Sequence, residues 1–456
     1  MTIINNALSG AIAAQAALNA ASQNVANLQT PGYTRQGVLL AAIAPGSGTK
    51  QAGNGVEVSS LLRISDAYKT QQMWRANAEQ GRYATTQPYL TQLEQVMGDD
   101  KSSLSYGVDN FFKALNAVGE EPTSAPLRGQ VVAQAGALAE SFNSIYQVTR
   151  NQQLSVQQQR DAIVPKFNTL TQNIAALNTR IVAASATGTN VSSLIDERDM
   201  AIDSLSQLAA LEVLEQPDGS RAVSLKSGQP LVVGNQAASL GIDTSGGTPQ
   251  MQVTFARSVY GVDDTAVGGQ IGGLGTFEKN VLQPLQDSIV SMASQLATRI
   301  NDQLGAGTDS AGNPGKPMFA INGGGGGGIL SVSAGYSADD LALSADGTPG
   351  DSANLQMLVD IKNQTITLGS VGTVILGDAD TQLVGKLAID SQQNKSLLNT
   401  ATTIRQQSED DWAATSGVNR DEEAMNLVEF QNMYQANMKV IAVANSLFDA
   451  TLAMFG

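Results

Sequence analysis

Apolar side chains recur through the first 28 residues with the spacing of a helix that packs on one side. The apolar positions are Ile4, Leu8, Ala11, Leu18 and Val25. Together with the polar residues Gln15 and Ser22 they form one series with alternating steps of four and three. This heptad seam predicts a helix from about Ile4 to Leu28 that pairs with another helix. Proline and glycine then end it at Thr30-Pro31-Gly32.

A second seam runs through the last 40 residues. Its main positions are spaced by seven, with Phe430 as an intermediate rung: Leu427, Tyr434, Ile441, Phe448 and Phe455. Asn419 is the expected N-cap of this helix, and Glu422 follows three residues later as in a capping box. At about 1.5 Å per residue, roughly 35 residues of helix predict a rod about 50 Å long.

Further helices are expected between the two ends. They cover Ser65 to Met97, Leu104 to Val118, Pro126 to about Ala186 with an interruption at Pro165, Ser192 to Ala210, Phe277 to Leu304 and Leu383 to about Ala414. Apolar residues from Ile163 to Ile181 keep the four-three spacing, so we expect that face to pack on another long helix. Short β-branched runs between Gly, Pro and Asp turns predict strands at 212–214, 221–225, 231–233, 251–256, 329–333, 365–368 and 371–376.

These elements predict a mainly α protein with a β insert, organised in three parts. Residues 1–44 with 417–456 form a terminal α-helical coiled coil, which is the assembly domain. Residues 45–211 with 276–304 and 380–416 form a discontinuous bundle of long helices. Residues 212–275 with 305–379 form an inserted β-rich outer domain.

Composition excludes several kinds of chemistry. The chain has 456 residues, with 26 Lys+Arg against 41 Asp+Glu for a net charge of −15, and it has neither cysteine nor histidine. Disulfides, Cys/His metal sites and Ser-His-Asp or Cys-His nucleophiles are therefore impossible. The acidic balance argues against nucleic acid as a partner. Asn, Gln and Ser interrupt the longest apolar stretches of the N-terminus, so neither a Sec-type signal nor membrane insertion is expected.

The remaining candidates for chemistry read better as structure. Gly46 to Lys50 lacks the ending of a phosphate loop, and the glycines from Gly268 to Gly275 are expected in turns. Asp309 to Asn313 lacks the central ligand and the bidentate Glu of a calcium loop. A glycosidase requires two carboxylates that face each other across a cleft, and carboxylates that are adjacent in the sequence do not. Within Asp196 to Asp199 we expect Glu197 and Asp199 to point outward and Arg198 to bridge helices. No catalytic, cofactor-binding or metal-binding residue is predicted.

The two ends need partners. Residues Met1 to Thr34 carry no charged side chain, which suits a helix buried on several sides. Burial of the five C-terminal anchors provides about 7–15 kcal/mol, less than the cost of ordering the helix at about 1–2 kcal/mol per residue. We therefore expect an oligomer whose assembly interface consists of the seam residues: Ile4, Leu8, Ala11, Leu18, Val25, Leu427, Phe430, Tyr434, Ile441, Phe448 and Phe455. An intrachain helical hairpin is the alternative, but it leaves the missing charge unexplained.

Both ends carry a recognisable signature. The N-terminal segment includes Asn24, Asn27, Thr30, Pro31, Gly32 and Tyr33, and the tail includes Gly417-Val418-Asn419, Asp421-Glu422-Glu423 and Tyr434-Gln435-Ala436-Asn437. These segments resemble the terminal signatures of the bacterial flagellar rod, hook and hook-associated axial proteins. Three middle stretches are similar to the hook-associated branch of that family: Asn54 to Val58, Leu194 to Ser206 and Gly273 to Leu282.

The resemblance implies a structural subunit at the junction between hook and filament, with no enzyme activity and no cofactor. It implies export through the flagellar type III apparatus and a final extracellular location in the flagellum. The implied partners are other copies of the chain, the hook protein below, a second junction protein (hook-associated protein 3) above, and a cytoplasmic chaperone on the C-terminal helix. Two alternatives stay open: a hook or rod axial subunit, and an envelope glycan hydrolase that carries axial termini.

Overall fold

The computed structural model describes residues 2–44, 53–99, 103–245, 249–323, 328–348 and 350–455. Its α-helices are α1 (Thr2–Ala26), α2 (Ala67–Met97), α3 (Leu104–Val118), α4 (Ala125–Ala186), α5 (Ser192–Leu208), α6 (Gly269–Phe277), α7 (Gln283–Gly305), α8 (Ala353–Asp360), α9 (Ala379–Ser416) and α10 (Arg420–Phe455). A π-helical turn, Glu278–Leu282, joins α6 to α7. The fold is mainly α with inserted β-sheets, as the sequence predicts.

The strands form small antiparallel sheets. They are β1 (Gln36–Ala42), β2 (Val56–Arg63), β3 (Leu211–Glu215), β4 (Arg221–Leu225), β5 (Pro230–Val233), β6 (Gln236–Ala237), β7 (Ser239–Asp243), β8 (Gln250–Phe255), β9 (Ser258–Val262), β10 (Phe319–Ile321), β11 (Leu330–Val332), β12 (Thr365–Leu368) and β13 (Gly372–Ile375). The sheet orders are β1-β2, β3-β4-β5-β6, β7-β8-β9, β10-β11 and β12-β13. The strands β1, β2, β6, β7, β9 and β10 lie outside the strands that the sequence predicts.

The chain divides into two compact units. The first comprises Met1–Glu79, Lys166–Val262 and Ala401–Gly456, and the second comprises Gln80–Pro165 and Asp263–Thr400. The helix α4 runs through Pro165 without the expected interruption. Its neighbours Ile163 and Phe167 are buried on either side of the proline, and this packing outweighs the loss of one backbone donor.

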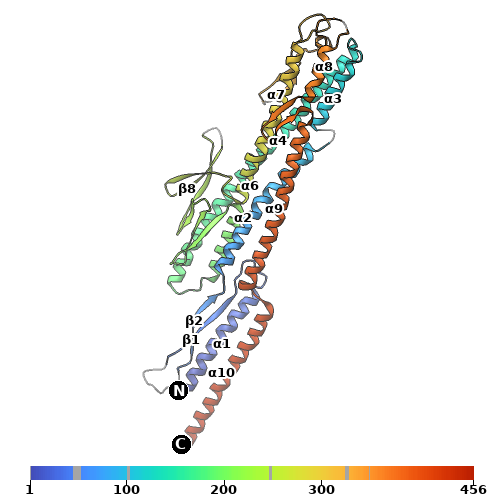
Figure 1. Ribbon diagram of the computed structural model, residues 1–456. Coiled ribbons are helices and arrows are strands. Elements are labelled where there is room, and N and C mark those ends of the chain that lie inside the picture. The colour runs from blue at the N-terminus through green and yellow to red at the C-terminus, as the bar shows by residue number, and fades with distance from the viewer. Residues whose placement is uncertain are drawn as a thin grey trace. The chain divides into compact units, whose positions relative to one another are not determined.

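In the first unit, α1 and α10 lie side by side in opposite directions (Figure 1). The β1–β2 hairpin packs along α1 and has a register shift between Leu39 and Leu40. The Ser9 hydroxyl on α1 accepts a hydrogen bond from the Val56 backbone N–H at 3.1 Å. Gly55 precedes Val56 with φ +100°, and a Cβ there would lie 2.1 Å from Ser9 Oγ. The start of β2 can therefore approach α1 closely because a glycine precedes it.

A recurring contact attaches the strands to helices in both units. The side-chain carboxamide of a helical Asn or Gln donates to the carbonyl and accepts from the N–H of one strand residue, at 2.7 to 3.2 Å. We call this contact a carboxamide clamp. The pairs are Asn24 with Gln36, Asn143 with Leu330, Asn168 with Leu240, Asn178 with Arg221, Gln295 with Thr367 and Asn301 with Phe319.

The clamps account for where the β segments lie. Asn168 and Asn178 bind β7 and β4 to the second half of α4, so sheets cover part of the face where we expected another long helix. Gln295 and Asn301 bind β12 and β10 to α7 in the second unit. Residues 212–275 and 305–379, which we expected to form a single β-rich domain, are thus divided between the two units.

The second unit has a core of aromatic and aliphatic side chains. Phe111 on α3 contacts Phe112 and Phe319, with ring centroids 5.4 and 5.8 Å apart. The glycines expected in turns lie mostly in the buried helix α6. A Cβ at Gly273 would lie 2.3 Å from the Arg82 carbonyl oxygen. These glycines therefore allow α6 to pack tightly against α2.

Candidate functional site

We call the turn that follows α1 the signature turn (residues 27–36). The buried side-chain amide of Asn24 holds this turn in place by hydrogen bonds. The Asn24 side chain is only 1% exposed. Besides clamping Gln36, its Oδ1 accepts a hydrogen bond from the Tyr33 hydroxyl at 2.9 Å. Burial, together with the nearby carboxylates of Asp196 and Glu423, raises the pKa of Tyr33 to about 12. The phenol stays protonated at neutral pH and can keep donating this bond.

The rest of the signature stops the helix. The Asn27 amide donates to the Gln23 carbonyl oxygen at 2.9 Å, one turn back along the helix. The Thr30 hydroxyl donates to Asn27 Oδ1 at 3.1 Å. Pro31 is exposed, and Gly32 follows it with φ +73°. A Cβ at Gly32 would lie 2.4 Å from Met200 Cγ on α5, so this position requires glycine for both its backbone angle and its packing.

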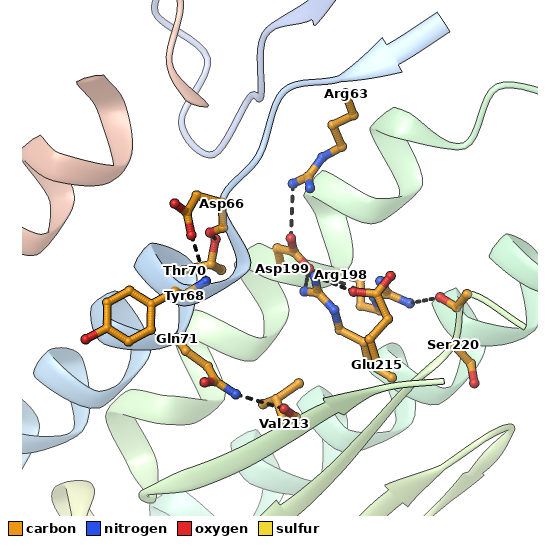
Figure 2. A network of polar contacts seen from close by, with 12 residues as sticks. Arg63, Asp66, Tyr68, Thr70, Gln71, Arg198, Asp199, Val213, Glu215 and Ser220 are labelled. Atoms are coloured by element: carbon orange, nitrogen blue, oxygen red, sulfur yellow. Dashed lines mark hydrogen bonds and ion pairs between the residues drawn. The ribbon is translucent and has the colours of Figure 1, made fainter. Parts of the chain in front are cut away.

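A hydrogen bond from the signature turn and two ion pairs from the end of β2 converge on α5. The Thr34 backbone N–H donates to Asp196 Oδ2 at 3.1 Å, and Arg63 Nε donates to Asp196 Oδ1 at 2.8 Å. Arg63, at the end of β2, also contacts Asp199 Oδ2 at 3.0 Å (Figure 2). The carboxylate of Asp196 therefore links the signature turn and the hairpin to one helix.

Arg35 binds the same turn to the start of α10. Its guanidinium contacts Glu423 Oε1 at 2.7 Å and Glu422 Oε2 at 2.8 Å. Its backbone N–H donates to the Ser416 carbonyl oxygen at 2.8 Å. Glu423 is only 1% exposed, so Arg35 neutralises a buried carboxylate. Spacing along the chain does not predict this pairing, and the only signal in the sequence is that Arg35 is the first charged residue.

Figure 2 shows the ion network beneath the turn. Asp199 is buried between Arg63 and Arg221, so the expectation that it points outward is wrong, whereas Glu197 is exposed. Burial raises the pKa of the Asp199 carboxyl, and the surrounding arginines oppose that rise. Arg198 is 1% exposed and donates to Asn178 Oδ1 on α4 at 3.1 Å and to the Gly219 carbonyl oxygen at 2.8 Å. It bridges helices as expected.

The seam between α1 and α10 is built from small side chains. Apart from Asn24, the buried residues of α1 are alanines, none more than 4% exposed: Ala7, Ala11, Ala13, Ala14, Ala17 and Ala21. A Cβ at Gly10 would lie 2.6 Å from Asn437 Oδ1 on α10. Small residues on one face let two helices approach closely, and so Ala7, Ala14 and Ala21 occupy the rungs that we had assigned to Leu8, Gln15 and Ser22.

The predicted assembly residues have three kinds of environment. Ala11 is buried. Ile4, Leu18, Leu427, Phe430, Tyr434 and Ile441 are half-buried. Leu8, Val25 and Phe448 are 49%, 39% and 62% exposed. The side chain of Phe455 lies outside the part of the chain that the structure describes.

Large apolar side chains cover the outer faces of both terminal helices. On α1 they are Ile3, Leu8, Ile12 and Val25, and on α10 they are Met425, Val428, Met433, Met438, Val440, Val443, Leu447, Phe448, Leu452 and Met454. Only Lys439 and Asp449 are charged among residues 430–455. An exposed apolar surface of this extent marks an interaction site.

The described residues offer little for catalysis. Among them, no group of three or more carboxylates is placed to hold a metal ion. Asp309 Oδ1 instead accepts hydrogen bonds from the backbone N–H groups of Ala311 and Asn313, both at 2.8 Å. Gly46 to Lys50 lies outside the described residues. In the described part of the chain, no helix is both long and apolar enough to cross a membrane.

Family models match three stretches of the chain. The flagellar hook-associated protein FlgK helical domain matches residues 90–319, which is more than half of the sequence. The flagella basal body rod protein matches residues 4–34, and the flagellar basal body rod FlgEFG protein C-terminal matches residues 413–454. The two short matches coincide with the signature at each end.

Individual proteins are similar over the full length. The flagellar hook-associated protein 1 of Escherichia coli strain K12 is 26% identical over 549 aligned residues, covering 99% of each chain. Its Bacillus subtilis strain 168 counterpart is 27% identical over 488 aligned residues, covering 97% of this chain and 96% of the relative. The solved structure of the flagellar hook junction protein FlgK from Burkholderia pseudomallei matches with a TM-score of 0.52 and 29% identity, over 55% of this chain and 47% of that one. That match spans about half the length of the solved chain.

Proposed function

Because this chain belongs to the flagellar hook-associated protein FlgK family, and is therefore a structural protein of the bacterial flagellum and not an enzyme, we propose that it forms the junction between hook and filament. A glycan hydrolase is thereby excluded. A hook or rod subunit is the second candidate, since the matches at both ends are to rod protein models. The match over residues 90–319 favours the junction, because it is to the hook-associated family.

The observation that carries this proposal is the unpartnered apolar surface of α1 and α10. The two helices pack against each other along one face, where the α10 seam residues are half-buried, and both expose apolar side chains elsewhere. Assembly of many copies would bury these side chains, at about 25 cal/mol per Å² of apolar surface. We infer that the exposed seam residues Leu8, Val25 and Phe448 are intermolecular contacts.

The end of α10 extends beyond its intrachain partner. Gly10 lies against Asn437, and α1 begins eight residues before Gly10, so α10 has no α1 partner beyond about residue 445. The remaining ten or so residues extend about 15 Å at the usual helical rise, as Figure 1 shows at the C-terminus. Phe448 continues the seam of Leu427, Tyr434 and Ile441 into this overhang. We assign the overhang to contact with a second copy.

The remaining details of the proposal concern export and neighbouring proteins. The chain has no cysteine, so no disulfide obstructs passage as an unfolded chain through the flagellar type III apparatus. Before export, the apolar face of α10 suits a cytoplasmic chaperone. After export, the chain would lie outside the cell between the hook protein and hook-associated protein 3.

The test replaces Phe448 with Asp in a bacterium whose own copy has been deleted. We expect hooks without filaments and loss of swimming, because a carboxylate in the overhang opposes apolar burial between copies. Met357→Asp is the matched control: Met357 is 59% exposed, against 62% for Phe448, but lies on α8 in the second unit. Normal filaments with Phe448→Asp would contradict assembly through the overhang. Absence of hooks in the deletion strain would favour a hook or rod subunit.

A further inference from the structure

Every methionine of α10 is exposed to solvent. The four side chains are 41% to 84% exposed, and they are Met425, Met433, Met438 and Met454. By contrast, four methionines in the rest of the chain are no more than 5% exposed: Met97, Met251, Met292 and Met318. The helix from which assembly is proposed therefore carries a group of thioethers that solvent reaches.

These methionines are spread around the helix. At about 100° per residue, Met425 and Met454 lie on the side of α10 away from Tyr434, a half-buried residue of the seam with α1. Met433 and Met438 flank the seam on its two sides. A second copy that packs along α10 therefore meets a methionine from whichever side it approaches.

The thioether is the only sulfur group of the chain, because there is no cysteine. When a peroxide oxidises it, a lone pair of the sulfur attacks one peroxide oxygen and the O–O bond breaks. Sulfur loses two electrons and becomes the sulfoxide, while hydrogen peroxide is reduced to water. Buried methionines can react in this way only when the structure around them opens.

The product no longer suits an apolar contact. Oxidation turns a flexible apolar side chain into a polar one and disrupts interfaces that contain methionine. We propose that the four α10 methionines form a sulfoxidation site for peroxides, and that their oxidation blocks assembly of the subunit. The second part of this inference rests on the proposed function. Because the four side chains lie at the surface, oxidation leaves the fold of the monomer intact.

The site is open only before assembly. In the flagellum, other copies cover α10, so peroxide reaches these sulfur atoms in the free subunit and not in the assembled one. Met357 on α8 is 59% exposed and belongs to the second unit, away from the terminal helices. It should react in both states and so report the dose of peroxide.

The site is tested on the purified full-length chain treated with hydrogen peroxide. Peptide mass spectrometry measures the sulfoxide at each methionine over time. We expect the four α10 methionines to react about tenfold faster than Met97, Met292 and Met318, because the buried residues must wait for local opening. Far-ultraviolet circular dichroism should stay unchanged when only α10 is oxidised. Equal rates at exposed and buried positions, or loss of helix at this stage, would overturn the site.

Isolated hooks from a strain that lacks its own copy of the chain test the effect on assembly. The chain is treated with peroxide, the excess is removed with catalase, and the amount that sediments with hooks is divided by the amount for the same chain untreated. We expect this ratio to fall to about one tenth, because a polar sulfoxide is buried in an apolar contact.

Leucine variants connect the loss to α10. Leucine has nearly the volume of methionine but no sulfur, so the variant that combines Met425→Leu, Met433→Leu, Met438→Leu and Met454→Leu should keep a ratio close to one. Met357→Leu is the matched control and should lose binding as the natural sequence does. An unchanged ratio for the natural sequence, or an equal fall in the fourfold variant, would overturn the effect on assembly.

Reduction tests the same claim in reverse. Methionine sulfoxide reductases A and B together act on both sulfoxide epimers and should restore hook binding. A loss that persists after mass spectrometry shows the sulfoxides to be removed would assign the effect to other damage and overturn it. Absence of hook binding by the untreated chain would instead contradict the junction proposal, and the order of oxidation would still decide the sulfoxidation site.

Discussion

Asn24 at the end of α1 and the residues of the signature turn have separate physical tasks. Asn24 satisfies the backbone of Gln36 and the Tyr33 hydroxyl from a buried position, whereas Gly32 supplies a positive φ and room for Met200. Arg35 neutralises the buried Glu423. The short sequence that identifies the family thus also forms the junction between α1, α5 and α10.

At this scale we predict the effect of Gly32→Ala. The left-handed backbone angle costs about 1–2 kcal/mol for alanine, and the new Cβ also overlaps Met200. Gly188 is the matched control, because it has φ +70° but nothing within 4 Å of an added Cβ. Urea denaturation should show a larger loss of stability for Gly32→Ala than for Gly188→Ala. Met200→Ala should relieve only the difference between them, and equal losses in the two glycine variants would refute a steric role for Met200.

At the scale of elements, the carboxamide clamps decide which helix each β segment joins. A helix cannot extend a strand's hydrogen-bond ladder with its own backbone, because its peptide groups are already paired. A side-chain carboxamide offers the same donor and acceptor as a peptide group. Each clamp therefore fixes both the position and the register of a strand against a helix.

We predict that Asn301→Asp loosens the β10–β11 hairpin. The carboxylate keeps the acceptor for the Phe319 N–H but loses the donor to its carbonyl oxygen. An unsatisfied carbonyl facing a carboxylate should cost about 1–3 kcal/mol. Hydrogen exchange should therefore accelerate in 319–321 and 330–332. The control is Asn363→Asp, a change at an exposed residue of the same unit, which should leave exchange in both strands unaltered. Unaltered exchange in Asn301→Asp as well would show that this clamp does not stabilise the hairpin.

At the scale of the whole molecule, the last ten or so residues of α10 extend beyond α1 in the monomer. The overhang of α10 exposes apolar side chains at Leu447, Phe448 and Leu452, and the described part of α1, which begins at Thr2, does not extend along it. Most of the stability of protein helices comes from tertiary packing, and a helix packed on no side is marginal in water. We therefore expect a gradient of stability along α10 in the monomer.

Hydrogen exchange on the monomer measures this gradient. Amides beyond about residue 446 should exchange fastest, those of 420–441 more slowly, and those of the buried α5 slowest within the first unit. In assembled flagella the fast region should become protected. Uniform protection of α10 in the monomer would mean that the overhang is stable alone, and the assembly interface would then have to lie elsewhere.

The sequence by itself determined the long helices, seven of the thirteen described strands and the family. Heptad spacing, caps and turn residues are local signals, and for that reason the predicted ends of α3, Leu104 and Val118, agree with the structure. The uncharged termini also marked the surface from which assembly is proposed.

Only the tertiary structure decided which faces meet. Alanines and Gly10 took the seam because close helix contact favours small side chains over the larger ones that periodicity emphasises. The β segments went to separate helices because single Asn and Gln side chains bind them there. Arg35 pairs with Glu423, which lies 388 positions away in the sequence. Arg405 pairs with Asp203 across 202 positions. No local pattern encodes such proximity.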